Sequence, residues 1–361
     1  MTVIEGQALT AAGFSHARLT IEGERVVRIE PVSGNGGPLI IPGFIDLHCH
    51  GGGGADIMEG GDAASRVARS HAKTGTTAFL ATTMTAPIEQ IERALADANA
   101  VSKHQQDDEA ALCGIHLEGP FISRDRLGAQ PDCVIDADIA LVKRLMGLAR
   151  LRVVTCAPEA DPDGGLTRWL ATKGVRVQLG HSSCDYETAR QCFSSGRHGV
   201  THMFNAMTPL HHRNPGAVGA ALAHADFAEL IPDLLHVHPG AMRAAMRAIP
   251  NVYAVTDATP ASGMPDGHYR LGSQSVQKCG NGVRLADGTL AGSSLTMHQA
   301  FRNLVSIGLS VEEAAWRTST IAADYLGLGD RGRIELGAIA DLVIMDGSLD
   351  LVGVVIRGVS Q

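Results

Sequence analysis

Short apolar stretches alternate with longer amphipathic segments along most of this chain. The short stretches are rich in Val, Ile, Leu and Thr and are bounded by Gly, Pro or polar residues, a pattern typical of buried parallel strands. Eight strands are predicted, at residues 39–48, 76–82, 111–118, 151–157, 175–181, 199–203, 230–237 and 251–257. Helices are predicted between them, at residues 63–74, 88–101, 135–148 and 186–195. Eight such strands close a barrel, so we predict an α/β fold of the (β/α)8 TIM-barrel type.

Both ends of the chain have a different pattern. Residues 1–42 and 333–361 contain short strands and turns but no helical periodicity. Neither end can bury a core alone, so we expect the two to form a small β-sandwich domain beside a barrel of residues 43–332. After the eighth strand, residues 280–288 predict a hairpin, and two further helices are predicted at 295–307 and 311–326.

Composition narrows the class of protein. The 361 residues are 45% hydrophobic and 19% charged, which is typical of a soluble globular chain. The net charge is −8 and there is no run of five basic residues, so nucleic acid is not an expected partner. The sequence shows no signal-like start and no apolar run of the roughly 20 residues that a membrane span needs. Seven scattered cysteines without a CxxC motif predict reduced thiols and a cytoplasmic protein.

Metal-binding residue types fall at the ends of five predicted strands. Side chains two residues apart leave a strand on the same side, and the carboxyl ends of barrel strands share one rim. Imidazoles and carboxylates without thiolates suit zinc, iron, manganese or cobalt. We therefore predict a metal site at this rim. Its candidate ligands are His48 and His50 on the first strand, Glu118 on the third, His181 on the fifth and His202 on the sixth.

The eighth predicted strand ends in Asp257, across the barrel mouth from the other candidates. A bound metal lowers the pKa of water and polarises a carbonyl, so Asp257 could accept the proton of the water and pass it to a leaving amine. The alternative interpretation is that Asp257 caps the segment that follows it. His116 is close enough to Glu118 to be a ligand, but we favour a supporting role behind the ligands.

Several motifs carry a resemblance to a known family. The stretch Pro42-Gly-Phe-Ile-Asp-Leu-His-Cys-His50, with a late aspartate, resembles the amidohydrolase superfamily. Within it, the motifs at residues 116–122, 179–182, 201–209, 255–258 and 290–296 resemble the N-acetylglucosamine-6-phosphate deacetylases. The resemblance runs from about residue 39 to the end of the chain. It implies a barrel with a β-sandwich, a homodimer, and hydrolysis of the acetamide of a 2-acetamido sugar phosphate.

The resemblance also assigns roles to residues. It implies that Glu118, His181 and His202 bind a divalent metal and that Asp257 is the general base. His48 and His50 match the members that can hold a second metal, so one or two ions are expected per subunit, with zinc as the first choice. The residues that match the family's phosphate contacts are Asn205, Ala206, Arg213 and His236. A guanidinium suits this task because it can grip a phosphate with two hydrogen bonds.

Two positions depart from the family pattern. Gln130 stands where the family commonly has a histidine that donates to the substrate, and it remains a candidate substrate-binding residue because its amide can donate a hydrogen bond. Leu234 stands where a glycine usually follows the residue that matches Asp233. Both are expected to face the sugar pocket. An epimeric sugar or another N-acyl amino sugar therefore stays open as the substrate.

Two other classes of protein fit the sequence less well. Cyclic-amide hydrolases of the same superfamily normally bridge two metals with a carboxylated lysine on the fourth strand, and residues 151–157 contain no lysine. A barrel kept only as a binding module would have lost its ligands, whereas this chain has the full set. Stoichiometric metal would separate an enzyme from such a module.

Overall fold

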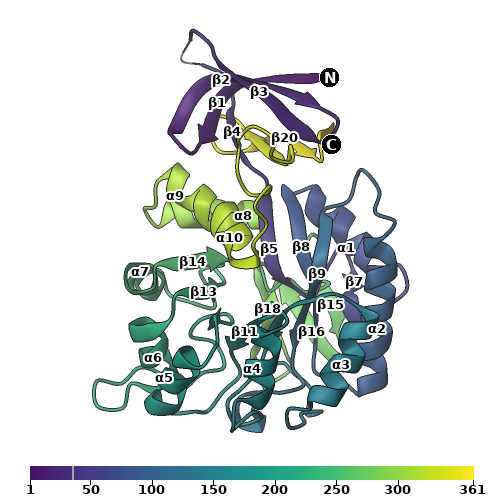
Figure 1. Cartoon of the computed structure of the whole chain (residues 1–361), viewed down its shortest axis with the longest axis vertical. Helices are drawn as coiled ribbons and strands as arrows, with labels where there is room; N and C mark the ends of the chain where they lie inside the picture. Colours follow the sequence, from purple (N-terminus) through teal and green to yellow (C-terminus); the bar gives the residue numbers. More distant parts are fainter. Residues whose placement is uncertain (35) are drawn as a thin grey trace.

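The computed structural model describes residues 1–34 and 36–361. Figure 1 shows a barrel of strands and helices with a separate sheet at one pole, where both termini lie. The barrel strands are β5 (Phe44–Cys49), β8 (Thr76–Thr83), β9 (Ala111–Glu118), β10 (Leu151–Thr155), β11 (Arg176–Leu179), β12 (Gly199–Val200), β13 (Phe227–Leu230) and β14 (Asn251–Ala254). The first six form one parallel sheet in the order β12-β11-β10-β9-β8-β5, and β13 pairs in parallel with β14.

Backbone hydrogen bonds connect this pair of strands to the sheet on both sides. The amide of Met203, after β12, donates to the carbonyl of Glu229 in β13 at 2.9 Å. The amide of Asp257, after β14, donates to the carbonyl of His48 in β5 at 2.9 Å. The eight strands therefore close into a ring, and the predicted (β/α) barrel is confirmed.

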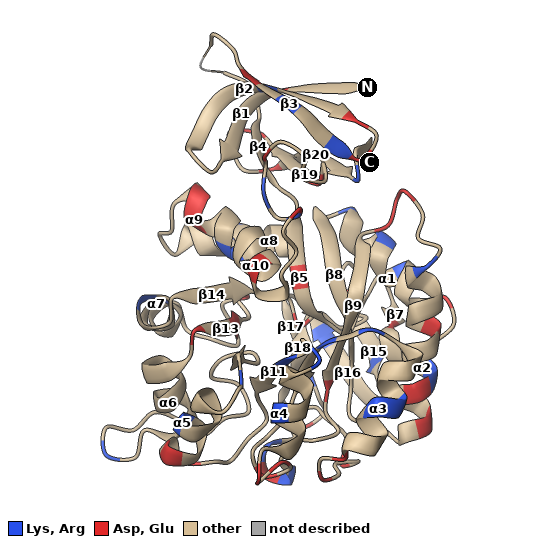
Figure 2. Cartoon of the chain, viewed as in Figure 1, with Lys and Arg blue, Asp and Glu red and all other residues tan. Residues whose placement is uncertain are grey.

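Helices follow the barrel strands and cover their outer faces (Figure 1). They are α1 (Ala63–Ala72), α2 (Ile88–Ser102), α3 (Ile139–Leu148), α4 (Gly165–Ala171), α5 (Tyr186–Ser194), α6 (Gly216–His224), α7 (Pro239–Ala248), α8 (Met297–Ser306), α9 (Val311–Ala315) and α10 (Ile321–Leu326). α3 starts at Ile139, later than predicted, because the side chain of Asp138 caps the helix by accepting from the amides of Ala140 and Leu141. Lys, Arg, Asp and Glu lie mainly on these helices and on loops (Figure 2).

The ends of the chain meet in one seven-stranded sheet. Its strands are β1 (Thr2–Thr10), β2 (Gly13–Glu22), β3 (Arg25–Pro31), β4 (Leu39–Pro42), β19 (Leu342–Met345), β20 (Leu351–Ile356) and β21 (Val359–Ser360), in the order β21-β20-β19-β4-β1-β2-β3. From Ala17 to Glu22, the side chains of β2 alternate between buried and more exposed positions, as a sheet with one covered face requires. Ala17, Leu19 and Ile21 of β2 pack with Leu342 and Val355 from the C-terminal strands.

Four antiparallel strands follow the eighth barrel strand: β15 (Gly267–Leu271), β16 (Gln274–Cys279), β17 (Gly282–Arg284) and β18 (Leu290–Ser293). The predicted hairpin at residues 280–288 lies within this sheet, where Arg284 pairs with Leu290. A second, very short hairpin, β6 (Gly51–Gly52) with β7 (Ala55–Asp56), follows β5 directly.

Two strand predictions were wrong. The predicted strand at 39–48 is two strands, because the chain leaves the terminal sheet after β4 and enters the barrel at β5. The break falls at Gly43, where a Cβ would lie 2.3 Å from the side chain of Thr77. The seventh strand is β13, at residues 227–230, and most of the predicted segment 230–237 is irregular. Its apolar residues suggested a strand, but Pro232 cannot donate to a strand ladder.

Candidate metal and catalytic site

Glu118, His181 and His202 converge at the carboxyl-terminal rim of the barrel. The Oε1 atom of Glu118 lies 3.2 Å from Nε2 of His181 and 3.1 Å from Nε2 of His202, and the two nitrogens are 3.0 Å apart. Ligands of a tetrahedral zinc ion, at about 2.0–2.1 Å from the metal, are separated by about 3.3 Å. The three atoms are therefore spaced as the ligands of one divalent cation.

A second group lies beside the first. Nε2 of His48 and Nε2 of His50 are 3.2 Å apart, and Oδ1 of Asp257 lies 3.5 Å from the former and 3.3 Å from the latter. Glu118 joins the two groups, because its second oxygen, Oε2, is 3.2 Å from Nε2 of His50. The carboxylate of Asp257 is thus directed at the two histidines rather than at a helix terminus. The donor set fits one cation, or two bridged by Glu118.

The ligand side chains rest on a buried glutamate that the sequence analysis missed. Oε2 of Glu229 lies 2.9 Å from Nδ1 of His48 and accepts from the amide of His202 at 3.1 Å. It therefore holds Nε2 of His48 toward the site. The sequence does contain a signal for Glu229, because a charged residue stands within the apolar run Phe227-Ala-Glu-Leu-Ile231. It was overlooked because the seventh strand was predicted three residues too late.

His116 lies behind the ligands, as the sequence analysis favoured. Its Nδ1 is 3.1 Å from the carbonyl of Leu47 and its Nε2 is 2.8 Å from the hydroxyl of Thr155. Its ring packs edge-on against that of His48, with centroids 4.6 Å apart. Burial, followed by the neighbouring His48, lowers the pKa of His116 to about 4, so it packs there as a neutral ring.

Three of the converging side chains belong to residues with left-handed backbone. The φ angles are 48° at His181, 28° at His202 and 50° at Asp257. Such values are unfavourable for residues with a Cβ and persist only where the surroundings hold them. Around Asp257, the carbonyl of His48 accepts from its amide and its own carbonyl accepts from the amide of Ser293, at 2.9 and 2.8 Å.

The electrostatic field at the site favours positive charge. Burial by itself would lower the pKa of His50, but hydrogen bonds to Asp257 and Glu118 outweigh it and raise this pKa to about 9. Burial would raise the pKa of Asp257, but His48 and His50 hold it below its ordinary value. The carboxylates are therefore ionised at neutral pH, which is the state that binds a cation.

A cavity of about 360 Å³ is lined by five of the six donor residues, namely Glu118, His181, His202, His50 and Asp257, and the sixth, His48, is fully buried. The cavity walls include four of the predicted substrate-binding residues, namely Gln130, Asn205, Ala206 and His236. The hairpin strands after β14 contribute Leu271, Leu290 and Gly292. The volume is in the range of small-molecule sites, and convergent polar side chains stand beside apolar ones such as Met84 and Leu271, as is usual in such sites.

Gln130 is held at both ends of its amide. Its Oε1 accepts from the amide of Thr85 at 2.7 Å, which fixes the orientation of the group, and its Nε2 donates to Oε2 of Glu118 at 2.5 Å. One N–H of the amide is left for the cavity. The residue that replaces the family's histidine thus positions Glu118 as well as facing the pocket.

His236 forms a pair with Asp233 at the cavity wall. Its Nδ1 lies 2.6 Å from Oδ2 of Asp233. Burial would lower the pKa of His236, but this hydrogen bond and the charge of Asp233 outweigh it and raise the pKa. Leu234 has a φ of 66°, a value that suits the glycine usual in the family. The expectation that Leu234 faces the sugar pocket was wrong, because its side chain lines a neighbouring hollow with Leu235 and Asn281.

Arg213 is the one predicted substrate-binding residue that the chain does not bring to the cavity. It is exposed, and its Nη1 lies 2.8 Å from Nε2 of His212. It does not line the pocket around Glu118 and Asp257.

Comparison with known proteins gives consistent results. The model of the amidohydrolase family matches residues 39–360. An N-acetylglucosamine-6-phosphate deacetylase of Lysinibacillus sphaericus is 40% identical over 86% of this chain and 82% of its own length. An N-acetylgalactosamine-6-phosphate deacetylase of Escherichia coli O157:H7 is 37% identical over 92% of this chain and 91% of its own.

A solved structure is also similar over nearly the whole chain. It is that of an aspartate-to-alanine variant of N-acetyl-D-glucosamine-6-phosphate deacetylase from Mycobacterium smegmatis in complex with N-acetyl-D-glucosamine-6-phosphate. The TM-score is 0.92, with 31% sequence identity, and the match covers 99% of this chain and 98% of the other.

Proposed function

We propose, because this chain belongs to the amidohydrolase family and within it to the N-acetylglucosamine-6-phosphate deacetylases, that it hydrolyses N-acetylglucosamine 6-phosphate to glucosamine 6-phosphate and acetate. The observation that carries the proposal is the pair of donor groups joined by Glu118 at a sugar-sized cavity. Water supplies the hydroxyl of the new carboxyl group, and the C–N bond of the acetamide breaks.

The residues present fit a catalytic divalent cation. Glu118, His181 and His202 would hold one ion, and His48, His50 and Asp257 would hold a second where two are bound. Zinc is our first proposal, and the nitrogen and oxygen donors also suit iron, manganese or cobalt. When bound, the cation would polarise the acetamide carbonyl and make water acidic enough to attack near neutral pH.

Asp257 is proposed as the general base. Asp257 lines the cavity, and the neighbouring His48 and His50 hold the pKa of its carboxyl below the ordinary value, so that it is ionised at neutral pH. In this position it would take a proton from the attacking water and give it to the leaving nitrogen as the C–N bond breaks. The amine thus leaves in neutral form.

The cavity walls would hold the sugar phosphate. His236, whose protonated form is favoured by Asp233, would offer an N–H donor and, when protonated, a positive charge to the phosphate. Asn205 and Ala206 belong to the loop that follows β12 and would supply amide groups beside it. The free N–H of Gln130 would donate to the acetamide or to a sugar hydroxyl.

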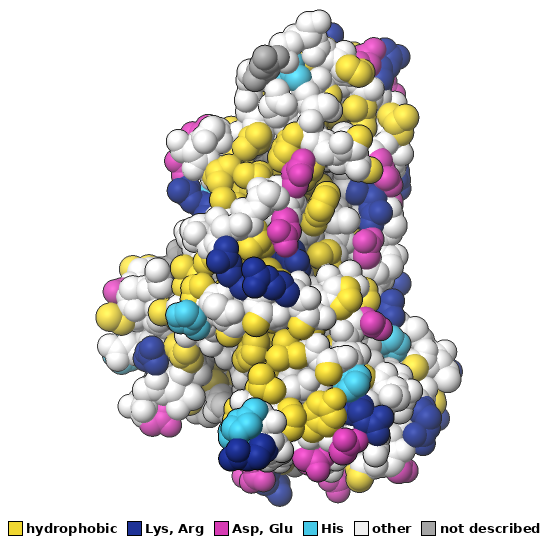
Figure 3. Space-filling view, turned by 90° about the vertical axis from the view of Figure 1, so that its left-hand side faces the viewer, with side chains coloured by type: hydrophobic (Ala, Val, Ile, Leu, Met, Phe, Trp, Pro, Cys, Tyr) yellow, Lys and Arg dark blue, Asp and Glu magenta, His cyan; other side chains and the backbone are white. Residues whose placement is uncertain are grey.

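Arg213 is proposed to act from a partner subunit of a homodimer. It lies outside the cavity of its own chain, in the same loop as the exposed Leu210. Leu234, Leu235 and Trp316 are also exposed. Figure 3 shows the face that carries α5 to α7, where apolar side chains gather above a group of histidine and basic side chains. The guanidinium of Arg213 does not reach the cavity of its own subunit, and exposed apolar side chains lie on the same molecule. Both features support a dimer in which Arg213 binds the substrate of the partner.

We also propose that the enzyme acts in the cytoplasm. All seven cysteines are free thiols, four of them buried, as expected in a reducing compartment. Within the described residues, the helices are too short or too polar to cross a membrane.

The first test is acetate release by metal-loaded protein from N-acetylglucosamine 6-phosphate, from the galactosamine epimer and from the unphosphorylated sugar. Turnover of the first substrate well above the others would support the proposal. Preference for the epimer would move the assignment to the alternative that the Escherichia coli relative suggests. The absence of turnover on all three, with metal bound, would contradict it. The cyclic-amide alternative is less favoured because β10 has no lysine to carboxylate.

A further inference from the structure

A second cluster of metal-binding residue types lies outside the barrel mouth, and the proposed reaction does not use it. It consists of Asp46 and Cys49 on β5 and His71 on α1, all buried. Cys49 does not line the cavity to which His50 contributes, and its Sγ lies beside the imidazole of His71. The cluster therefore lies between β5 and the helix that covers it.

Three polar atoms of this region form a compact triangle. Sγ of Cys49 lies 3.3 Å from Nε2 of His71 and 3.4 Å from the carbonyl oxygen of Gly51, and that oxygen is 2.9 Å from Nε2. In a zinc site with sulfur at 2.3 Å and nitrogen or oxygen near 2.0–2.1 Å, such atoms are separated by about 3.3–3.6 Å. Movements of a few tenths of an ångström would bring the three atoms to ligand spacing.

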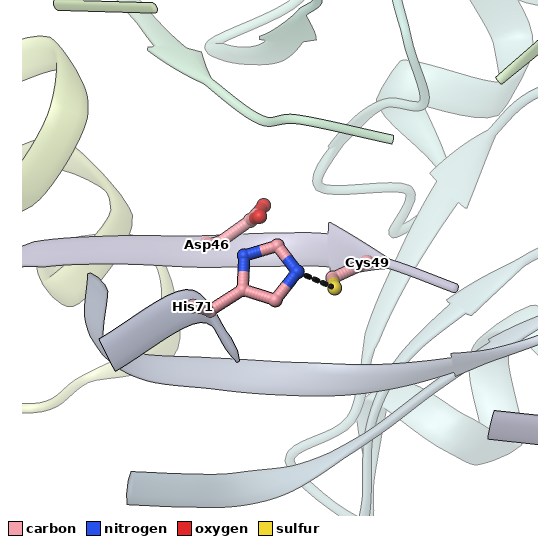
Figure 4. A group of neighbouring side chains, drawn as sticks. All are labelled: Asp46, Cys49 and His71. Atoms are coloured by element: carbon pink, nitrogen blue, oxygen red, sulfur yellow. Dashed lines mark hydrogen bonds between the residues drawn. The ribbon is translucent and has the colours of Figure 1, made fainter. Parts of the chain in front are cut away.

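The other side of the imidazole supports the same interpretation. Figure 4 shows the ring of His71 between the thiol of Cys49 and the carboxylate of Asp46. Nδ1 of His71 is buried and has no hydrogen-bond partner, although a buried ring nitrogen normally has one. The carboxylate of Asp46 is held by the amide and hydroxyl of Thr256. A carboxylate behind the ring of a metal-binding histidine orients that histidine and increases its basicity.

Glycine at position 52 makes room for this arrangement. A Cβ at Gly52 would lie 2.6 Å from Nε2 of His71. The hairpin of β6 and β7 can therefore cover the imidazole closely, with the carbonyl of Gly51 directed at it. The result is a compact, buried group of one sulfur, one nitrogen and one oxygen donor.

We propose that Cys49, His71 and the carbonyl of Gly51 form a second metal site, specific for a thiophilic cation such as Zn²⁺, with Asp46 as the carboxylate that positions His71. On binding, a sulfur–metal bond forms and the thiol proton passes to the solvent. The ion would tie the loop that follows His50 to α1. This proposal does not depend on the sugar substrate.

The test uses the full-length enzyme with its catalytic site loaded with zinc, titrated with Cd²⁺. Thiolate-to-cadmium charge transfer absorbs in the ultraviolet, and a site made only of nitrogen and oxygen ligands cannot give this band. The wild type should gain the band with saturation at one cadmium per chain. Cys49→Ala should lose it and keep deacetylase turnover, and His71→Gln should weaken cadmium binding by about tenfold or more.

The matched control is Cys279→Ser, which removes the exposed thiol and should leave the band unchanged. Absence of the band in the wild type, or a band that survives Cys49→Ala, would overturn the proposal. If Cys49→Ala does not fold, His71→Gln decides the outcome, because its amide can still donate to Gly51 but binds metals poorly. Loss of turnover on sugar substrates alone would concern the proposed function and not this site.

Discussion

Substitution of Glu229 by Gln tests how the catalytic site is held in place. The side chain keeps its size and can still accept a hydrogen bond, but it loses the charge that faces Nδ1 of His48 at 2.9 Å. Loss of such a supporting carboxylate typically weakens metal binding 10–100-fold, which corresponds to about 1.4–2.7 kcal/mol. Glu229 also accepts from the amide of His202, so ligands in both donor groups would be affected.

The assay is competition for metal with a chromophoric chelator, together with kcat at saturating metal. We expect the metal affinity to fall within the range above and kcat to recover in part when metal is in excess. Glu109→Gln is the matched control, since Glu109 is an equally buried glutamate that pairs with Arg69 away from the cavity. It should leave the metal affinity unchanged. Equal affinities in Glu229→Gln, Glu109→Gln and the wild type would refute the supporting role.

The remaining predictions concern the proposed reaction. Asp257→Asn should abolish turnover while at least one metal ion stays bound, measured by metal analysis; wild-type turnover would remove Asp257 as the base. Arg213→Ala should raise KM for phosphorylated substrate far more than for the free sugar, and mixed dimers with Asp257→Asn should regain activity if Arg213 acts across the subunits. Asp233→Asn removes the partner that raises the pKa of His236, so phosphate-dependent kcat/KM should decline at a lower pH than in the wild type, because only protonated His236 is a cation. Gln130→Leu removes one donor to Oε2 of Glu118 and leaves the amide of Thr85 without a partner, so it should cost about 1–3 kcal/mol of stability, seen in the unfolding midpoint.

Periodicity located most of the barrel because its strands are buried on both sides. β8 and β9 contain buried or nearly buried residues along their whole length, so continuous apolar runs revealed them. β13 was not predicted, because Glu229 interrupts its apolar run and the apolar residues that follow it have the pattern of a strand. The break at Gly43 depends on the contact with Thr77, which no local pattern contains.

The sequence predicted those site residues that stand at the carboxyl ends of barrel strands, because these ends meet at one rim. His48, His50, Glu118, His181 and His202 followed from that geometry alone. The clamp on Gln130 depends on the amide of Thr85, which comes from a different strand end, and the position of Arg213 outside the cavity depends on how one loop folds. Contacts between distant loops leave no periodic trace in a sequence, so these features required the structure.

The left-handed backbone at His181, His202 and Asp257 also bears on how such a protein would change if selection for catalysis ceased. Each of these residues costs about 1–3 kcal/mol of conformational energy that glycine would not incur. A descendant freed from its chemistry would gain thermal stability by mutating these positions to glycine. Relatives that have lost catalysis should therefore differ in sequence from active ones. They should have glycine at the positions where the active enzyme has His181, His202 and Asp257.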